Sequence, residues 1–209
     1  MQMAKVLKLA AKELRLSEPT KADLLAIKRR PIYIICDNVL DTYNIGSIFR
    51  LADAVAASCV YLCAGSETPP NSRIAKASVG TDKWVRWKYF KTANEAIVYL
   101  RKKFSIKSNS KISILRAKSR SSSIKIIAIE QHPKAKDFRS LNYERLTGLA
   151  GRQAMNHKRP VAFVVGHETT GIGKATLALC DEIVEIPMFG VNKSLNVMVS
   201  LAIVLYTAI

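Results

Sequence analysis

The sequence predicts an α/β fold with a mostly parallel sheet and helices on both faces. Short apolar runs rich in branched residues alternate with segments of helical periodicity, which is typical of such folds. The runs are apolar throughout, as in strands buried on both faces. With 209 residues and 49% hydrophobic side chains, the chain suits one domain with a sizeable core. This composition excludes wholesale disorder, and the 9 glycines and 4 cysteines exclude collagen-like and disulfide-scaffold classes.

The first 30 residues predict a basic helical arm. Residues 3–15 place apolar side chains at helical spacing among lysines and arginine, and a break at 17–19 ends that helix. Thr20 and Asp23 form the pattern of a capping box for a second helix, which reaches about Lys28. Pro31 ends the arm, so we expect the main domain to span 31–209.

The main domain is expected to alternate strands with helices. The predicted strands span 32–36, 60–63, 84–89, 125–130, 161–165 and 183–186, and the predicted helices span 45–57, 93–103, 171–179 and 194–206. Residues 64–83 are expected to form loops. Residues 105–123 are rich in serine and basic side chains, and we interpret them as a flexible insertion that holds one short strand at most.

The charge of the chain is strongly positive and unevenly spread. It carries 33 lysines and arginines against 16 acidic residues, a formal charge of +17. Residues 1–30 hold a net +5 and residues 101–125 a net +9, which leaves +3 for the rest. Such a charge indicates a polyanionic partner, either nucleic acid or an anionic membrane surface. The basic helix at 3–15 has no aromatic residue on its apolar face, which disfavours the membrane.

The four cysteines predict buried thiols in a reducing compartment. Cys36, Cys59, Cys63 and Cys180 lie in or beside apolar runs, and the Cys59–Cys63 pair lacks the second pair that a structural zinc site needs. The N-terminus shows no secretory signal pattern, and the apolar tail 195–209 is shorter than the roughly 20 residues of a membrane span. We therefore expect a cytoplasmic protein with no bound metal and no membrane partner.

Three polar, glycine-containing loops follow predicted strands, at the edge of a parallel sheet where ligands usually bind. In the first, Asn44 stands where a helix N-cap belongs, and Gly46 allows a close backbone approach. The free amides of the first helical turn can meet an anion, and Arg50 can bind a phosphate or orient a ribose hydroxyl. A capped helix with a surface arginine fits the local pattern equally well.

The second loop contains Gly166, Glu168 and Gly171 between a strand and a helix. It lacks the Gly-Lys-Ser/Thr ending of a phosphate-binding P-loop and the glycine spacing of dinucleotide-binding loops. Glu168 can accept hydrogen bonds from a ligand, or it can brace the turn by accepting nearby amides. His167 is interpreted as a structural or surface residue, since the sequence assigns it no carboxylate partner.

The third loop runs from Ile186 past Met188 and Gly190 to Ser194 and Asn196. Gly190 permits an unusual backbone angle, and Ser194 is a natural N-cap for the last helix. Asn196 then lies in the first helical turn, where its side chain can point into the same space as the loop. A capped helix without a ligand is the simpler alternative.

In this order and spacing, the three loops resemble the signature motifs of the SpoU/TrmH family, within the SPOUT class of RNA 2′-O-ribose methyltransferases. The matching patterns are Asn44-x-Gly46-x3-Arg50, Gly166-x-Glu168-x2-Gly171 and Ile186-Pro-Met-x-Gly190-x3-Ser194-Leu-Asn196-Val. The resemblance covers about residues 31–209. One departure is His167, where the second motif usually has Asn.

The resemblance implies an enzyme that transfers a methyl group from S-adenosylmethionine to a ribose 2′-hydroxyl of tRNA or rRNA. It also implies a homodimer and a deep C-terminal trefoil knot that holds the cofactor. By this resemblance Arg50 is catalytic, and the residues that orient substrate or cofactor are Asn44, Glu168, Ser194 and Asn196. The cofactor contacts implied are Gly166, Glu168, Gly171, Ile186, Met188, Gly190, Ser194 and Leu195. The alternative is a catalytically silent RNA-binding or assembly factor on the same scaffold.

Overall fold

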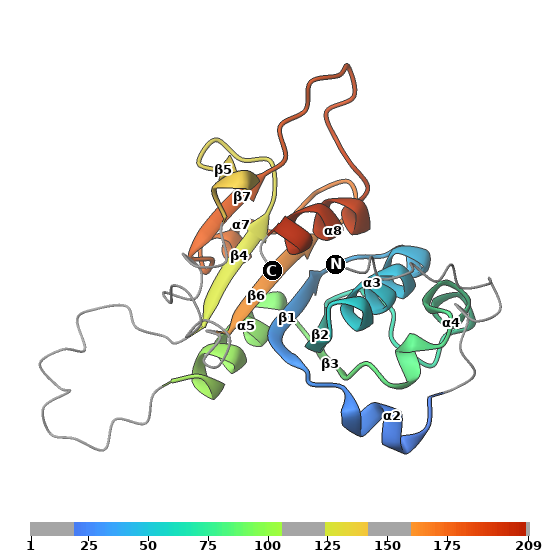
Figure 1. Cartoon of the computed structure of the whole chain (residues 1–209). Helices are drawn as coiled ribbons and strands as arrows, with labels where there is room; N and C mark the ends of the chain where they lie inside the picture. Colours follow the sequence, from blue (N-terminus) through green and yellow to red (C-terminus); the bar gives the residue numbers. More distant parts are fainter. Residues whose placement is uncertain (1–18, 106–123, 142–159, 208–209) are drawn as a thin grey trace, which may run out of the picture.

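A parallel sheet of seven strands forms the centre of the computed structural model, which describes residues 19–105, 124–141 and 160–207 (Figure 1). The strand order is β3-β2-β1-β6-β4-β7-β5, and every adjacent pair is parallel. The predicted fold class is therefore confirmed for the described residues. The strands are β1 (Arg30–Asp37), β2 (Ala57–Cys63), β3 (Trp87–Phe90), β4 (Lys125–Ile129), β5 (Lys136–Asp137), β6 (Val161–Gly166) and β7 (Glu182–Glu185).

Helices cover both faces of the sheet. Successive residues of the central strands point to opposite faces, so neighbouring residues pack against different helices. Ile34 of β1 belongs to an apolar cluster that includes residues of α3, α4 and α8. Its neighbour Ile35 belongs to a second cluster that includes residues of α5 and, at its rim, of α7. The helices are α2 (Lys21–Ala26), α3 (Thr42–Ala54), α4 (Ser72–Ser78), α5 (Ala93–Lys103), α7 (Lys174–Leu177) and α8 (Val197–Thr207).

The register of the central strands brings the sequence motifs to one edge of the sheet. β1 and β6 end side by side, since Asp37 pairs with Gly166, and β4 lies on the other side of β6. The loops that follow β1, β4 and β6 therefore start next to one another. This is the carboxyl edge at which parallel sheets usually bind ligands.

Two helix caps differ from the sequence-based prediction. The side chain of Asp41, not that of Asn44, accepts the Tyr43 N–H and caps α3, so Asn44 lies inside the helix. Asn196, not Ser194, precedes α8, and its Oδ1 accepts the N–H groups of Met198 and Val199. In each case the capping bond is made by a short polar side chain two or three residues from the predicted cap.

Two helices also differ in extent. The helix predicted at 171–179 is reduced to Lys174–Leu177, because the amides of Ile172 and Gly173 donate to Glu130 and Asp37 instead of starting a helix. The region 64–83, predicted to be loop, contains α4, whose N-cap Asn71 accepts two backbone amides. An asparagine after two prolines was the available signal for that helix.

At the N-terminal side, the predicted capping box is present. The Thr20 hydroxyl accepts the Asp23 N–H, the Asp23 carboxylate accepts the Thr20 N–H, and α2 follows. The predicted helix at 3–15 and nearly all of the predicted insertion at 105–123 lie outside the described residues.

Among the described residues, Cys36, Cys59 and Cys63 are buried free thiols, and Cys180 is partly exposed. Burial raises the pKa of Cys59 to about 11 and that of Cys63 to about 12. In the same residues, no three His, Cys, Asp or Glu side chains are grouped to hold a metal ion. No helix of this part of the chain is long and apolar enough to cross a membrane.

Gly46 sets the close packing of α3 on α4. A Cβ at this position would lie 2.6 Å from the Ala77 Cβ, 2.6 Å from the Ile74 carbonyl oxygen and 2.9 Å from the Ser78 nitrogen. Two of these three atoms belong to the backbone of α4, so the contact relaxes only if the helices separate. The predicted close backbone approach at Gly46 is confirmed, and its partner is another helix.

We expect Gly46→Ala to lower the free energy of unfolding by about 1–3 kcal/mol, because overpacking forces α3 and α4 apart. Urea unfolding followed by circular dichroism measures this change. Gly190→Ala is the matched control, since nothing lies within 4 Å of a Cβ at that position. Equal stabilities of the two variants would contradict the packing argument.

Candidate functional site

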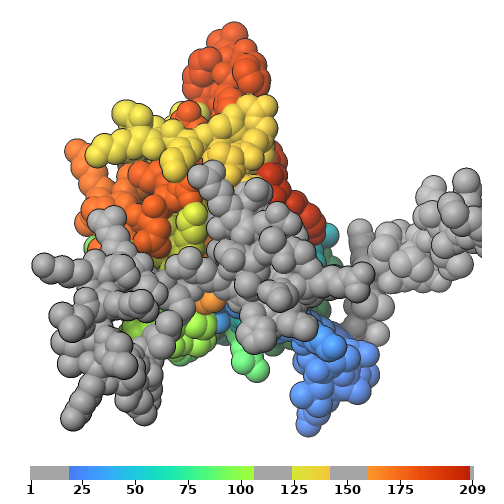
Figure 2. Space-filling view, turned by 60° about the vertical axis from the view of Figure 1, so that its left-hand side comes forward, coloured from blue at the N-terminus to red at the C-terminus, as the bar shows by residue number. Residues whose placement is uncertain are grey.

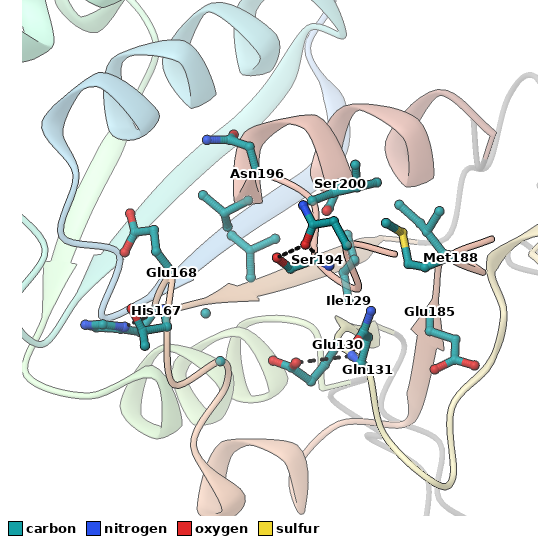
Figure 3. Close-up of a pocket in the computed structure, with 18 residues that line it drawn as sticks. Ile129, Glu130, Gln131, His167, Glu168, Glu185, Met188, Ser194, Asn196 and Ser200 are labelled. Atoms are coloured by element: carbon teal, nitrogen blue, oxygen red, sulfur yellow. Dashed lines mark hydrogen bonds between the residues drawn. The ribbon is translucent and has the colours of Figure 1, made fainter. Parts of the chain in front are cut away.

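A cavity of about 490 Å³ opens at the carboxyl edge of the sheet. In Figure 3, Glu130 and Gln131 lie on the side opposite Asn196 and Ser200, and Met188 lies across from His167. The loops after β4, β6 and β7 all contribute to its lining. Nine residues that the sequence singled out line it: Gly166, His167, Glu168, Gly171, Ile186, Met188, Ser194, Leu195 and Asn196.

The Glu168 carboxylate joins the loop after β6 to the loop after β1. Its two oxygens accept the N–H groups of Leu40 at 3.2 Å and Asp41 at 3.0 Å, and Oε1 also accepts the Asn44 side-chain amide at 3.0 Å. The bracing role considered for Glu168 is therefore present. The anion that meets the amides before α3 is the protein's own carboxylate.

Asn44 passes the connection on to the third loop. Its Oδ1 accepts a hydrogen bond from the Asn196 side-chain amide at 2.9 Å, while its Nδ2 donates to Glu168. Asn44 is buried, with an exposed fraction of 7%. One chain of side-chain hydrogen bonds thus runs from Asn196 through Asn44 to Glu168 and ties all three motifs together.

These hydrogen bonds also set the ionisation of Glu168. Partial burial by itself would raise the pKa of this carboxyl group. The donors on Asn44, Asp41 and Leu40 outweigh that effect and lower the pKa below its usual value. Glu168 is therefore ionised at neutral pH, as an acceptor of several N–H groups has to be.

Two glycines bring the backbone of the second loop against itself. A Cβ on Gly166 would lie 2.4 Å from the carbonyl carbon of Gly171 and 2.4 Å from the Ile172 nitrogen. Gly171 has a φ of +67°, and a Cβ there would lie 2.4 Å from Oε2 of Glu130. The Glu130 carboxylate in turn accepts the N–H groups of Ile172 at 2.8 Å and Gln131 at 3.1 Å. The loop is thus clamped between glycine backbone and one carboxylate.

His167 stabilises the turn between these glycines. Its Nδ1 accepts the backbone N–H groups of Thr169 at 3.0 Å and Thr170 at 3.3 Å. An asparagine Oδ1 accepts N–H groups two and three residues ahead in the same way. The structural interpretation of His167 is supported, and the change from Asn keeps an acceptor where the turn needs one.

The third loop lines the cavity only in part. Ile186, Met188, Ser194 and Leu195 face it, whereas Gly190 does not line it. The loop tip stands out from the body (Figure 1), and Phe189 is 90% exposed. The glycines with positive φ in the described residues are Gly80 and Gly171, so Gly190 does not use the unusual backbone angle that it permits. Nothing lies within 4 Å of a Cβ at Gly190, so no packing contact requires glycine there.

The described lining combines apolar side chains with three carboxylates and contains no lysine or arginine. The carboxylates belong to Glu130, Glu168 and Glu185. Sequence reasoning missed Glu130, Gln131 and Glu185. The signal for Glu130 was its position directly after a predicted strand, the same position that the two motif loops occupy. The cavity is acidic inside a protein of charge +17, so it suits a cationic ligand.

Arg50 does not line this cavity and is exposed on α3. Arg50 lies six positions after Asn44 in the helix. This spacing corresponds to a net rotation of about 240°, so Arg50 points to another side of the helix. The structure thus brings Asn44, Glu168, Ser194 and Asn196 to the site within one chain, and leaves Arg50 outside it.

Comparison with known proteins decides the family. The model of the SpoU rRNA Methylase family matches residues 31–206. The chain belongs to this family. The SpoU resemblance that the three motifs predicted is confirmed, and the match covers every residue of the candidate site.

Three relatives illustrate the range of the family. The chain is 30% identical over 185 residues to a tRNA (guanosine(18)-2′-O)-methyltransferase of Escherichia coli K12, covering 87% of this chain and 64% of that protein. It is 27% identical to the protein of the same name from Thermus thermophilus, covering 87% and 76%. It is 25% identical to the 23S rRNA (guanosine-2′-O-)-methyltransferase RlmB of Vibrio parahaemolyticus, covering 93% and 65%.

Solved SpoU structures share the fold. The Aquifex aeolicus TrmH/SpoU tRNA modifying enzyme gives a TM-score of 0.65 at 22% identity, covering 88% of this chain and 77% of that one. AviRb from Streptomyces viridochromogenes, crystallised with the cofactor AdoMet, gives 0.63 at 23% identity, covering 89% and 63%. These likenesses support the sheet and helix arrangement described above.

The lowered pKa of Glu168 predicts a pH-dependent contribution to stability. The ionised carboxylate stabilises the fold fully above its unfolded pKa of about 4.3, and this contribution is lost as the pH falls through the lower folded value. Glu168→Gln removes it. The difference in unfolding free energy between wild type and variant should therefore shrink from about pH 6 to about pH 3 in urea titrations.

Glu67→Gln is the control, because Glu67 is an exposed loop residue. Its difference from wild type should stay small and flat over the same range. A Glu168→Gln difference that does not vary with pH would show that the hydrogen-bonded carboxylate adds no ionisation-linked stability.

Proposed function

We propose that the chain is an S-adenosylmethionine-dependent RNA 2′-O-ribose methyltransferase. The observation that carries the proposal is the acidic cavity at which all three motif loops of a SpoU family member meet through Asn196, Asn44 and Glu168. The relatives named above act, by their names, on guanosine in tRNA or 23S rRNA. We therefore take guanosine ribose in one of these RNAs as the substrate to test first.

The lining fits this cofactor. S-adenosylmethionine combines an adenine ring and a ribose with a sulfonium and an ammonium group. Ile129, Ile186 and Leu195 offer apolar surface for a ring, and the carboxylates of Glu130 and Glu185 offer acceptors for hydroxyl and cationic groups. A cofactor bearing phosphates would meet these carboxylates without a basic partner in the described lining. When bound, S-adenosylmethionine supplies the methyl group as an electrophile.

The chain's own residues then have to position the ribose and help its hydroxyl lose a proton. Asn44 and Glu168 hold the loops in place. Arg50 is the proposed catalytic residue, and a guanidinium group holds its proton too tightly to act as a base by itself. We assign it to binding an RNA phosphate beside the reacting ribose, where its charge favours the oxyanion that develops.

Within one chain Arg50 lies outside the cavity. A second copy of the chain would bring its own Arg50 to this cavity. α3 and α8 pack together. Their exposed apolar side chains include Tyr43 on α3 and Val199 and Tyr206 on α8. A homodimer through this face would bury these side chains and present Arg50 of one subunit to the cavity of the other. We also propose the trefoil knot of the SPOUT class for the C-terminal segment, on the basis of family membership.

The RNA would be held by the two basic segments at 1–30 and 101–125, whose charges together make up most of the excess. We propose a cytoplasmic location, which the free thiols of the described residues support. The division into a basic arm at 1–30 and a methyltransferase domain at 31–209 belongs to the same proposal.

The first test is cofactor binding. Titration calorimetry should show that the wild-type protein binds S-adenosylmethionine and that Gly166→Ala binds it at least tenfold more weakly, because the new Cβ displaces the clamped loop. Gly173→Ala is the matched control, since its nearest neighbours would lie 3.7 Å away or more. No binding by the wild type would favour the silent RNA-binding factor.

The second test is methyl transfer. Wild-type protein with labelled S-adenosylmethionine and total RNA should label RNA in an alkali-resistant form, as a 2′-O-methyl group does. Arg50→Ala should lower the rate by at least about 100-fold, the usual cost of removing one group that stabilises a developing oxyanion. Arg86→Ala, at an exposed arginine before β3, should keep the wild-type rate. Label that maps to a base would overturn the 2′-O assignment.

A further inference from the structure

A second cavity, of about 440 Å³, lies beside α7 and the start of β7. Three lysines line it, Lys134 from the connection between β4 and β5, Lys136 from β5 and Lys174 from α7, together with Asp181 and Glu182. In Figure 2 the yellow residues of 124–141 and the orange residues around α7 and β7 lie side by side on this face. The cavity therefore mixes both signs of charge, and its character depends on which of these charges are already paired.

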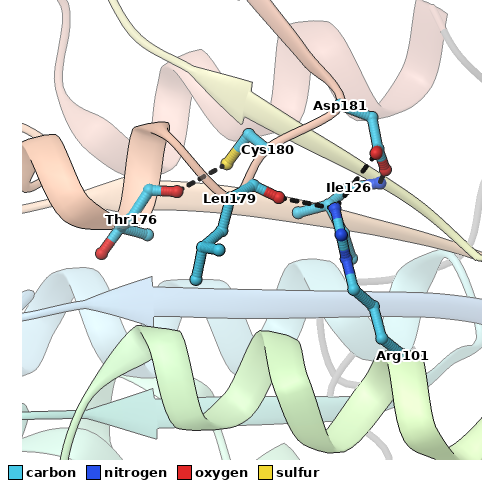
Figure 4. Close-up of polar contacts among 6 residues, drawn as sticks. All are labelled: Arg101, Ile126, Thr176, Leu179, Cys180 and Asp181. Carbon is cyan, nitrogen blue, oxygen red and sulfur yellow. Dashed lines mark hydrogen bonds and ion pairs between the residues drawn. The ribbon is translucent and has the colours of Figure 1, made fainter. Parts of the chain in front are cut away.

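Asp181 is fully engaged by the protein. Its Oδ1 accepts a hydrogen bond from Nη2 of Arg101 at 3.1 Å, and its Oδ2 accepts the Ile126 N–H at 2.8 Å (Figure 4). The same Arg101 nitrogen donates to the Leu179 carbonyl at 2.7 Å. Arg101 thus fixes the turn before β7 and neutralises the carboxylate next to the cavity.

Glu182 is neutralised in the same way. It forms ion pairs with Lys125 and, at 3.3 Å, with Lys136, and its side chain is only 14% exposed. Burial would raise the pKa of Glu182, but the two lysines lower it, so the carboxylate is ionised and paired. Both acids of the lining are therefore compensated.

Lys134 and Lys174 keep their charge available. Both are exposed, and neither forms an ion pair with a carboxylate of the described residues. With Asp181 and Glu182 matched by Arg101, Lys125 and Lys136, the local excess at this cavity is positive. A hollow with two available ammonium groups suits an oxyanion.

The surroundings indicate which oxyanion it is. Gln131 lines the first cavity and its chain neighbour His132 lines the second, and β7 runs from the second cavity, at Glu182, to the first, at Glu185. The residues that bound the basic segment 101–125 are also anchored here, Arg101 to Asp181 and Lys125 to Glu182. That segment carries nine basic residues and no acid. A chain of phosphates would find positive charge here and at the segment that starts from it.

We propose that this cavity, through Lys134 and Lys174, binds backbone phosphates of the RNA substrate. The proposal rests on the proposed function, because it takes the partner to be RNA. It adds a phosphate-binding site on the folded body, separate from the two basic segments. The proposal also changes the role of Arg101 and Lys125. Both belong to the basic segment proposed to bind RNA phosphates, but in the structure they neutralise Asp181 and Glu182.

The experiment compares two double variants with the same loss of charge. Lys134→Gln/Lys174→Gln removes the proposed contacts, and Lys76→Gln/Lys91→Gln removes two exposed lysines outside this cavity, one on α4 and one directly after the edge strand β3. Binding of bulk tRNA is measured by filter retention at several salt concentrations, and S-adenosylmethionine binding is measured by calorimetry for each protein.

We expect the Lys134/Lys174 variant to bind tRNA about tenfold more weakly at about 0.15 M salt, with a salt slope shallower by roughly 0.7–0.9 for each lost phosphate contact. The control variant should keep the wild-type slope. Cofactor affinity should be unchanged in both. Equal losses in the two variants would reduce the effect to net charge and overturn the proposal, and so would an unchanged slope. If wild-type protein binds no RNA at any salt concentration, the proposed function itself fails.

Discussion

The Glu168 carboxylate accepts two backbone amides from the loop after β1 and the side chain of Asn44, which in turn accepts from Asn196. The rest of the site depends on this arrangement. A charged acceptor with several N–H donors makes stronger bonds than neutral groups do. The loops therefore keep one arrangement around the cavity, and the sheet register that places Asp37 beside Gly166 makes that arrangement possible.

Much of the fold followed from the sequence because the strands are buried on both faces. Continuous apolar runs such as Ile32–Cys36 and Val161–Val165 admit little else in a protein of this size, and helix α5 occupies the predicted residues 93–103. The caps were harder to predict. Asp41 competes with Asn44, and Asn196 competes with Ser194, and all four side chains are capable caps. Only the tertiary partners, Glu168 for one pair and Asn44 for the other, decide between them.

The candidate site was predicted as a set of residues but not as a geometry. Glu168, Gly166 and Asn196 carry recognisable patterns, whereas Glu130 stands alone after its strand and matters only because Gly171 lies against it. Arg50 shows the limit most clearly. Its place in a motif predicts a functional role, but its position outside the cavity depends on helix phase, which the motif pattern does not convey. The expected role of two basic residues changed for a similar reason. Arg101 and Lys125 look free in the sequence and form ion pairs in the structure.

The hydrogen bonds of the site join residues that are far apart in the chain, 124 positions for Asn44 and Glu168 and 152 for Asn196 and Asn44. Contacts this distant form only after the entropy of closing long loops has been lost. The site therefore assembles late in folding, once β1 and β6 have paired and α8 has docked on the sheet. A ligand that binds there selects the completed fold and stabilises it by mass action. The supply of such a ligand and the survival of the folded protein are thereby linked through the same few side chains.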